Sequence, residues 1–254
     1  MMCSIMDSVS NTLGIDKVNM GGKLILIEEQ HDSNANFLLS AVISNALKKD
    51  YGICFVLFHN TFNHYHNVGM KFGYNLALLK EKNIVTFIEP IKIEALEMEN
   101  MYKKTMNKVI DSLFMTVRNE YSKMMKLNNR VIIIIDDLSH LYNFGFDLKQ
   151  SMYYIRWLRS LVENDNVSQL CILTHTYIHE VQSWFNTFID ALKYMAHLYV
   201  KVEPFKTGYS SDASGKMTIN WRVDPIRCNH NWPEVAKYIY KLSDRQVQIY
   251  ASGI

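Results

Sequence analysis

Residues 23–39 read KLILIEEQHDSNANFLL, an apolar run followed by a polar loop and a second apolar run. Residues 24–27 are typical of a strand buried on both faces, and residues 36–39 open an amphipathic helix. A strand, a loop and a helix in this order form the phosphate-binding start of many nucleotide-binding domains. The stretch therefore predicts the first unit of an α/β domain.

The loop of this unit, residues 28–35, contains no glycine and no lysine. A phosphate-binding loop needs glycines so that its amides can curl around phosphate, and a lysine to neutralise the charge. Glu28, Glu29 and Asp32 place carboxylates there instead, and these repel phosphate at contact distance. We infer the architecture of a nucleotide-binding domain without its own nucleotide site. We assign this chain no catalytic residue and no cofactor.

Composition favours one compact domain in a reducing compartment. The chain has 254 residues, of which 48% are hydrophobic and 20% charged, enough to bury a large core. A net charge of +2 does not by itself predict a nucleic-acid surface. The four cysteines are widely scattered. No apolar run approaches the ~20 residues of a membrane helix, so we expect no membrane contact. We expect the chain in the cytoplasm and leave the nucleus open as a second location.

Apolar strands alternate with helical segments along most of the chain, which predicts a largely parallel sheet covered on both faces. The further strands of this part are predicted at residues 53–58, 84–88, 131–135 and 170–173. Apolar residues at three- and four-residue steps predict one long amphipathic helix over residues 98–125. The last fifth of the chain predicts antiparallel strands at residues 198–202, 216–222, 238–242 and 247–250.

The strand at residues 131–135 ends in Asp136 and Asp137, at the edge where α/β proteins usually hold ligands. This pattern resembles the magnesium-binding strand of ATPases. Magnesium binding depends on a phosphate that the first loop cannot hold, so we favour a structural role. We expect the two carboxylates to cap the helix start that follows.

Several motifs together resemble the family of Elongator complex subunit six. The most specific stretch is FNHYHNVGMKFG at residues 62–73, supported by the opening unit, by IIIIDDLS at 132–139, by INWR at 219–222 and by YKLSD at 240–244. The resemblance covers nearly the whole chain. It divides the chain into a variable leader, residues 1–20, and a single RecA-like domain, residues 21–254.

The resemblance implies a RecA-like, mostly parallel twisted sheet flanked by helices, with antiparallel strands at the carboxyl end. It also implies a non-catalytic subunit that forms a hetero-hexameric ring with Elongator subunits four and five. That ring binds tRNA and supports modification of the wobble uridine (U34) at carbon five, with the chemistry in the third subunit. If ATP binds anywhere in the ring, we expect it at a loop of one of the other subunits. The alternative is an independent RecA-type ATP-binding enzyme, which only Asp136 and Asp137 support.

Residues of two loops are candidates for tRNA contact, because in RecA-like rings the loops after the fourth and fifth strands face the central pore. Here these loops are residues 143–150 and 174–183. Lys149, His175 and His179 are candidates for phosphate contact and Tyr177 for base stacking, with a simple solvated surface as the alternative.

Aromatic side chains mark candidate subunit interfaces, since tryptophan and tyrosine carry much interface energy. We select Trp157 and Trp184, for which a core position is the alternative. We assign Tyr153 and Ile155 to the core.

The histidines do not predict a metal site. His59, His64 and His66 follow the second strand, and His175 and His179 are four residues apart. The spacing of the last two suits zinc on a helix, but no third ligand is apparent from the sequence. We therefore expect no bound metal.

Overall fold

The structure is a computed structural model that describes residues 5–93, 107–176, 183–205, 213–244 and 246–251. Within these residues, nine strands form one sheet in the order β3-β2-β4-β5-β1-β6-β7-β8-β9. The strands are β1 (Leu24–Gln30), β2 (Gly52–Leu57), β3 (Val85–Ile88), β4 (Val131–Asp136), β5 (Gln169–Thr176), β6 (Leu198–Glu203), β7 (Gly215–Trp221), β8 (Val235–Ser243) and β9 (Gln246–Ala251). Every strand predicted from the sequence is present.

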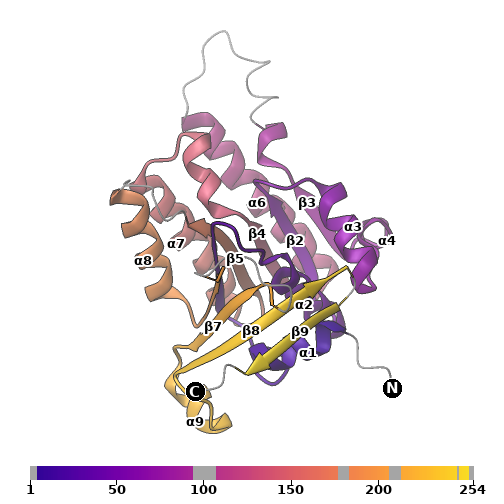
Figure 1. Cartoon of the computed structure of the whole chain (residues 1–254). Helices are drawn as coiled ribbons and strands as arrows, with labels where there is room; N and C mark the ends of the chain where they lie inside the picture. The colour runs from indigo at the N-terminus through magenta and orange to yellow at the C-terminus, as the bar shows by residue number, and fades with distance from the viewer. Residues whose placement is uncertain (1–4, 94–106, 177–182, 206–212, 245, 252–254) are drawn as a thin grey trace.

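The sheet changes from parallel to antiparallel at β6. Strands β3, β2, β4, β5, β1 and β6 pair in parallel. Strands β6, β7, β8 and β9 pair antiparallel and extend the sheet at the end of the chain, where Figure 1 shows β8 and β9 in yellow beside α1. The predicted mostly parallel sheet with antiparallel carboxyl-terminal strands is confirmed.

Helices cover both faces of the parallel part. They are α1 (Ile5–Leu13), α2 (Asn36–Lys48), α3 (Phe62–Phe72), α4 (Leu76–Glu81), α6 (Asn107–Leu127), the 3-10 helix η1 (Leu138–Phe144), α7 (Leu148–Asp165), α8 (Ser183–Met195) and α9 (Asp224–His230). Ile25 and Ile27 of β1 face the core under α1 and α2, whereas Leu24 and Leu26 face the core under α6, α7 and α8. This alternation is the strand period of two, and it buries β1 on both faces.

The predicted long amphipathic helix corresponds to α6. Its apolar stripe, which includes Leu113, Val117 and Met124, lies in the core on that face of the sheet. The first part of the prediction, residues 98–106, lies outside the described residues.

The residues that we set apart as a leader contribute to the core. Met6, Val9 and Leu13 of α1 are buried against the α2 face of the sheet. The indole Nε1 of Trp221 in β7 donates a hydrogen bond to the carbonyl oxygen of Leu13 at 3.0 Å. Residues 5–20 therefore pack as part of the domain, while the variability of this segment stays a prediction.

One core assignment was wrong. Ile155 is fully buried as expected, but Tyr153 is 65% exposed. At about 100° per residue, two positions on a helix that differ by two lie on opposite faces, so both side chains of α7 could not share the core.

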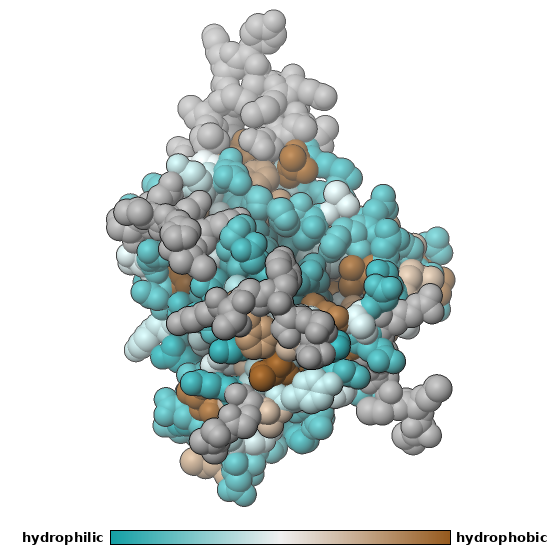
Figure 2. Space-filling model, viewed as in Figure 1, coloured by the Kyte–Doolittle hydropathy of each residue, from teal (hydrophilic) through white to brown (hydrophobic). Residues whose placement is uncertain are grey.

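The surface carries scattered apolar side chains on a polar background. Figure 2 shows that the face in view is mostly hydrophilic, with small separate brown areas. Within the described ranges, no helix combines the length and the apolar character needed to cross a membrane.

Candidate functional site

Charged and imidazole side chains gather at the carboxyl ends of three parallel strands. Glu28 and Glu29 come from β1, Asp136 and Asp137 from the end of β4, and His175 from β5. Because β1, β5 and β4 are neighbours in the sheet, their carboxyl ends meet at one edge. This is the edge at which α/β domains bind ligands.

Glu29 occupies the amino-terminal start of α2. Its Oε2 accepts a hydrogen bond from the backbone N–H of Ala35 at 2.8 Å. The next amide, of Asn36, donates to Oδ1 of Asn34 at 3.0 Å. Free amides at the start of a helix are what binds phosphate in nucleotide-binding domains. Here a carboxylate of the chain itself takes that place.

His175 lies between two carboxylates. Its Nε2 is 3.0 Å from Oε1 of Glu29, and its Nδ1 is 2.8 Å from Oδ2 of Asp137, an ion-pair distance outside hydrogen-bond geometry. Burial lowers the pKa of His175, but the adjacent carboxylates of Asp137 and Glu29 outweigh this effect and raise the pKa to about 10. The imidazole is therefore protonated at neutral pH and joins β1, β5 and β4.

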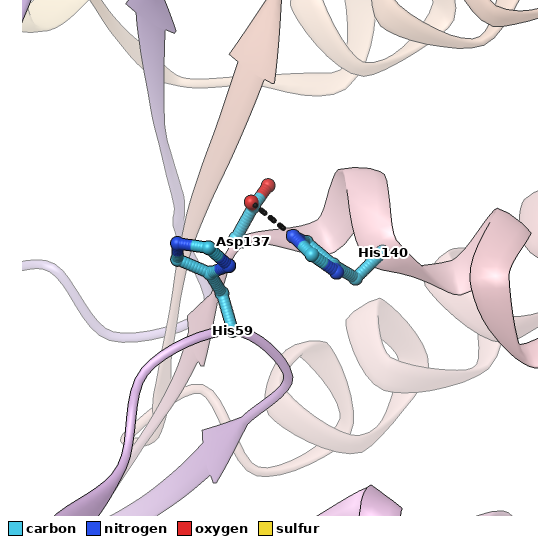
Figure 3. A group of neighbouring side chains, drawn as sticks. All are labelled: His59, Asp137 and His140. Atoms are coloured by element: carbon cyan, nitrogen blue, oxygen red, sulfur yellow. Dashed lines mark ion pairs between the residues drawn. The ribbon is translucent and has the colours of Figure 1, made fainter.

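Asp137 holds its neighbours through both carboxylate oxygens. Oδ1 accepts hydrogen bonds from the backbone N–H groups of Ser139 and His175, each at 3.2 Å. Nε2 of His140 lies 3.1 Å from Oδ2, the contact drawn in Figure 3. Burial alone would raise the pKa of Asp137, but His140 and His175 outweigh it and hold the pKa well below its usual range. The predicted capping role is confirmed for this residue, which caps η1.

Asp136 has a different environment from its neighbour. Its Oδ2 accepts the backbone N–H of Asn60 at 2.8 Å, whereas its Oδ1 is buried and has no hydrogen-bond partner in the described structure. Burial raises the pKa of Asp136. Its carboxyl group connects β4 to the loop after β2 and does not cap η1, contrary to our expectation.

Glu28 is neutralised on the α8 side of the cluster. Lys193 of α8 places Nζ 3.0 Å from its Oε2, and Thr176 donates a hydrogen bond to its Oε1 at 3.1 Å. The hydroxyl of Tyr199 donates to the same carboxylate. Both glutamates, which we expected in the first loop, lie in β1 instead and have structural partners within the domain.

The candidate tRNA residues fall in different settings. Lys149 is exposed in the first turn of α7. His175 belongs to β5, and its imidazole already pairs with Glu29 and Asp137. Its contact with phosphate stays a prediction, and it would compete with these two carboxylates. Tyr177 and His179 lie outside the described residues.

The two candidate interface residues also differ. Trp157 is half-buried and packs on Phe114 and Tyr154, with ring centroids at 4.8 and 6.1 Å. The side chain of Trp184 lies outside the described residues. Trp157 therefore packs on the domain while it stays partly exposed, and its role at an interface stays a prediction.

A surface groove runs between α6 and α7. Its volume is about 840 Å³, and its lining includes the apolar side chains Phe114, Met115 and Tyr153 together with Arg118 and Arg156. Lys149 and Trp157 lie in the same groove. The structure therefore brings one candidate tRNA residue and one candidate interface residue to a common surface.

The sequence analysis missed the association of His59, Asp137 and His140. Their ligand atoms all lie within 4.8 Å of one another. His59 follows β2, and Asp137 and His140 follow β4. A search for polar residues just past the carboxyl ends of parallel strands would have found all three, since such ends share an edge of the sheet.

Known proteins resemble this chain over nearly its full length. The family model described as "Elongation complex protein 6" matches residues 6–244. Elongator complex protein 6 of Homo sapiens is 24% identical over 252 residues, which cover 94% of this chain and 93% of the relative. The Drosophila melanogaster protein of the same name is 23% identical over 252 residues, covering 97% and 96%.

Solved structures with low sequence identity share the fold. The flagellar accessory protein FlaH from Methanocaldococcus jannaschii aligns with a TM-score of 0.60 at 13% identity, covering 97% of this chain and 96% of its own. A KaiC-like protein from Pyrococcus horikoshii aligns with a TM-score of 0.57 at 9% identity, covering 91% and 90%. These likenesses confirm the RecA-like α/β fold expected from the sequence. With a family match over residues 6–244, the chain belongs to the Elongation complex protein 6 family.

Proposed function

We propose that this chain is a non-catalytic subunit of the Elongator complex. With subunits four and five it forms a hetero-hexameric RecA-like ring that binds tRNA and supports modification of the wobble uridine at carbon five. Family membership supports the Elongator assignment. The observation that carries the non-catalytic role is the hydrogen bond from the Ala35 amide to Glu29, because it fills the phosphate position with a carboxylate.

Electrostatics and geometry oppose a nucleotide at this position. A phosphate at the start of α2 would have to displace the carboxylate of Glu29, which also pairs with His175. Removing that carboxylate would leave the imidazolium of His175 with Asp137 alone. Breaking one partner of a buried ion pair costs about 3–5 kcal/mol, so the closed arrangement resists nucleotide entry.

The alternative, an independent ATP-binding enzyme, requires a carboxylate ready to hold magnesium at the end of β4. Asp136 is buried with a raised pKa, and one of its oxygens is engaged by the Asn60 amide. Asp137 is engaged by His140, His175 and Ser139. Magnesium prefers oxygen ligands, whereas Asp137 faces two imidazole rings and one oxygen of Asp136 is taken by a backbone amide. This environment does not suit magnesium, which favours the non-catalytic role.

The groove between α6 and α7 is our candidate for a ring contact. Trp157 offers one open face there, and Tyr153 and Met115 are 65% and 53% exposed beside it. Aromatic and arginine side chains are the residue types that dominate interface energies. Lys149 at the same groove is the described residue that we propose for phosphate contact.

The test is co-expression of this chain with Elongator subunits four and five, followed by mass determination of the purified species. A hetero-hexamer with two copies of this chain supports the ring. A monomer that binds neither subunit four nor subunit five overturns it. We expect Trp157→Ala to weaken assembly, whereas Tyr250→Ala, which removes an exposed tyrosine of β9, leaves assembly unchanged.

Two further assays separate tRNA binding from nucleotide binding. Lys149→Glu should weaken tRNA binding by the assembled ring more than Lys237→Glu, a change at an exposed lysine of β8. An ATP titration of the isolated chain should show no saturation. Saturable micromolar ATP binding that Asp136→Ala abolishes would overturn the non-catalytic role and support the enzyme.

A further inference from the structure

Three side chains from separate segments converge beside the carboxyl ends of β2 and β4. His59 lies in the loop after β2, Asp137 follows the last residue of β4, and His140 lies in η1. Figure 3 shows both imidazole rings directed toward the carboxylate, and the three ligand atoms lie within 4.8 Å of one another. We propose that His59, Asp137 and His140 bind one Zn²⁺ ion.

The spacing of the ligand atoms suits a tetrahedral ion. With bonds of about 2.0–2.2 Å, two ligand atoms on tetrahedral zinc are separated by about 3.3–3.5 Å. Nε2 of His140 and Oδ2 of Asp137 already lie 3.1 Å apart, and the rings of His59 and His140 have centroids 4.6 Å apart. The side chain of His59 is exposed and can adjust, and its ligand atom already lies within 4.8 Å of the other two.

The surrounding residues leave the ligand atoms of Asp137 and His59 available to the ion in different ways. The carboxylate of Asp137 is oriented by the backbone N–H groups of Ser139 and His175, which both bind Oδ1 and leave Oδ2 facing His140. His59 forms ring contacts with His140 and His175 but no hydrogen bond or ion pair within the described part of the chain. Its ring nitrogens are therefore available without the loss of an existing bond.

His140 has a partner that can fix its ring for metal binding. Its Nδ1 lies 3.0 Å from the side-chain amide of Asn143. Binding zinc through Nε2 puts the proton on Nδ1, and the Asn143 amide, flipped so that its Oδ1 faces the ring, accepts a hydrogen bond from Nδ1–H. Such outer partners orient metal-binding histidines in many sites.

The charges around the cluster permit a divalent cation. His175 lies 2.8 Å from Oδ2 of Asp137, and Glu29 contacts the same imidazole from its other side. Asp137 then supplies the negative charge that faces the ion. Two imidazole nitrogens and one carboxylate select zinc over magnesium or calcium, which prefer oxygen ligands. Three protein ligands on a partly exposed cluster leave the fourth position to water.

The experiment uses the full-length chain, stripped with EDTA and dialysed. Calorimetric titration with Zn²⁺ should give one ion per chain, and Co²⁺ should give the visible absorption of a tetrahedral site. We expect His59→Ala and His140→Ala each to weaken zinc binding at least tenfold. His59 is exposed, so its replacement leaves the fold intact and keeps the test valid if His140→Ala is unstable.

The matched control is His64→Ala, which removes a nearby histidine of α3 that contacts Asn36. Zinc affinity should be unchanged in this variant. The proposal is overturned if the wild-type chain binds no zinc at micromolar concentration. It is also overturned if His59→Ala binds zinc as tightly as the wild type, because the ion would then lie elsewhere.

Discussion

The imidazole of His175 lies 3.0 Å from the carboxylate of Glu29, and this ion pair connects two adjacent parallel strands at the edge where a RecA-like domain would hold phosphate. The same glutamate blocks the start of α2. A single side chain therefore both closes the anion position and anchors the charged cluster.

We expect Glu29→Gln and His175→Gln each to lower the free energy of unfolding by about 3 kcal/mol, because each removes one charged partner from a largely buried charge. The double variant should lose less than the two single losses combined, by about 0.5–3 kcal/mol. Urea unfolding at pH 7 with EDTA measures both. His31→Gln, at an exposed histidine, is the control and should change stability by less than about 1 kcal/mol. Strict additivity would show that the two residues are not coupled.

Removing the hydroxyl group should change the free energy of unfolding differently at two buried tyrosines. Tyr121 donates to Asp165 and lies 2.9 Å from Ser168, whereas the hydroxyl of Tyr154 has no hydrogen-bond partner in the described structure. Tyr121→Phe should cost about 1–2 kcal/mol, and Tyr154→Phe should be neutral or stabilising. Thermal or urea unfolding of the pair tests this, and equal losses would contradict it.

His197 should make stability fall in mild acid. Its Nδ1 accepts a hydrogen bond from the N–H of Leu24 at 3.0 Å, and burial, with Arg159 and Lys23, lowers its pKa. Near pH 6 the unfolded chain therefore binds more protons at His197 than the folded chain does. The stability that His197 contributes is complete above the unfolded pKa of about 6.5 and is lost as pH falls through the folded pKa. His197→Asn keeps an acceptor but does not titrate. We expect urea unfolding at pH 7.5 and 5.5 to show a smaller acid loss for this variant than for the wild type.

Gly69 should tolerate no side chain. A Cβ atom there would lie 2.5 Å from the Tyr74 ring and 2.9 Å from the Tyr74 carbonyl oxygen. Gly69→Ala should therefore cost about 1–3 kcal/mol through forced displacement of the turn after α3. Met70→Ala, at a side chain 55% exposed on the same helix, should cost under about 0.5 kcal/mol. Equal unfolding midpoints for the two variants would contradict the expected clash.

The strands were predictable because burial on both faces requires continuous apolar runs. The residues at which the strands end were less predictable. We ended the fifth strand at residue 173, but β5 continues to Thr176, since His175 and Thr176 still pair with Glu29 and Gln30 of β1. Backbone pairing extends past the point where the side chains become polar, and only the partner strand determines how far.

The histidine cluster could not be predicted from spacing along the chain. His59 and His140 become neighbours only because β2 and β4 are adjacent in the sheet. The sequence pattern indicates strands but not their order. Asp137 was recognisable as a capping residue because the Ser139 amide that it binds is local in sequence, whereas its contact with His175 depends on the pairing of β4 with β5.

The hydrogen bond from Trp221 to Leu13 has a consequence for synthesis of the protein. Helix α1 also packs against β9, so after its synthesis this helix meets part of its packing surface only when the distant strand β9 has been made. Such long-range pairing slows folding, and the nascent chain exposes the apolar side of α1 throughout. We expect truncation before β9 to leave a chain that aggregates during translation.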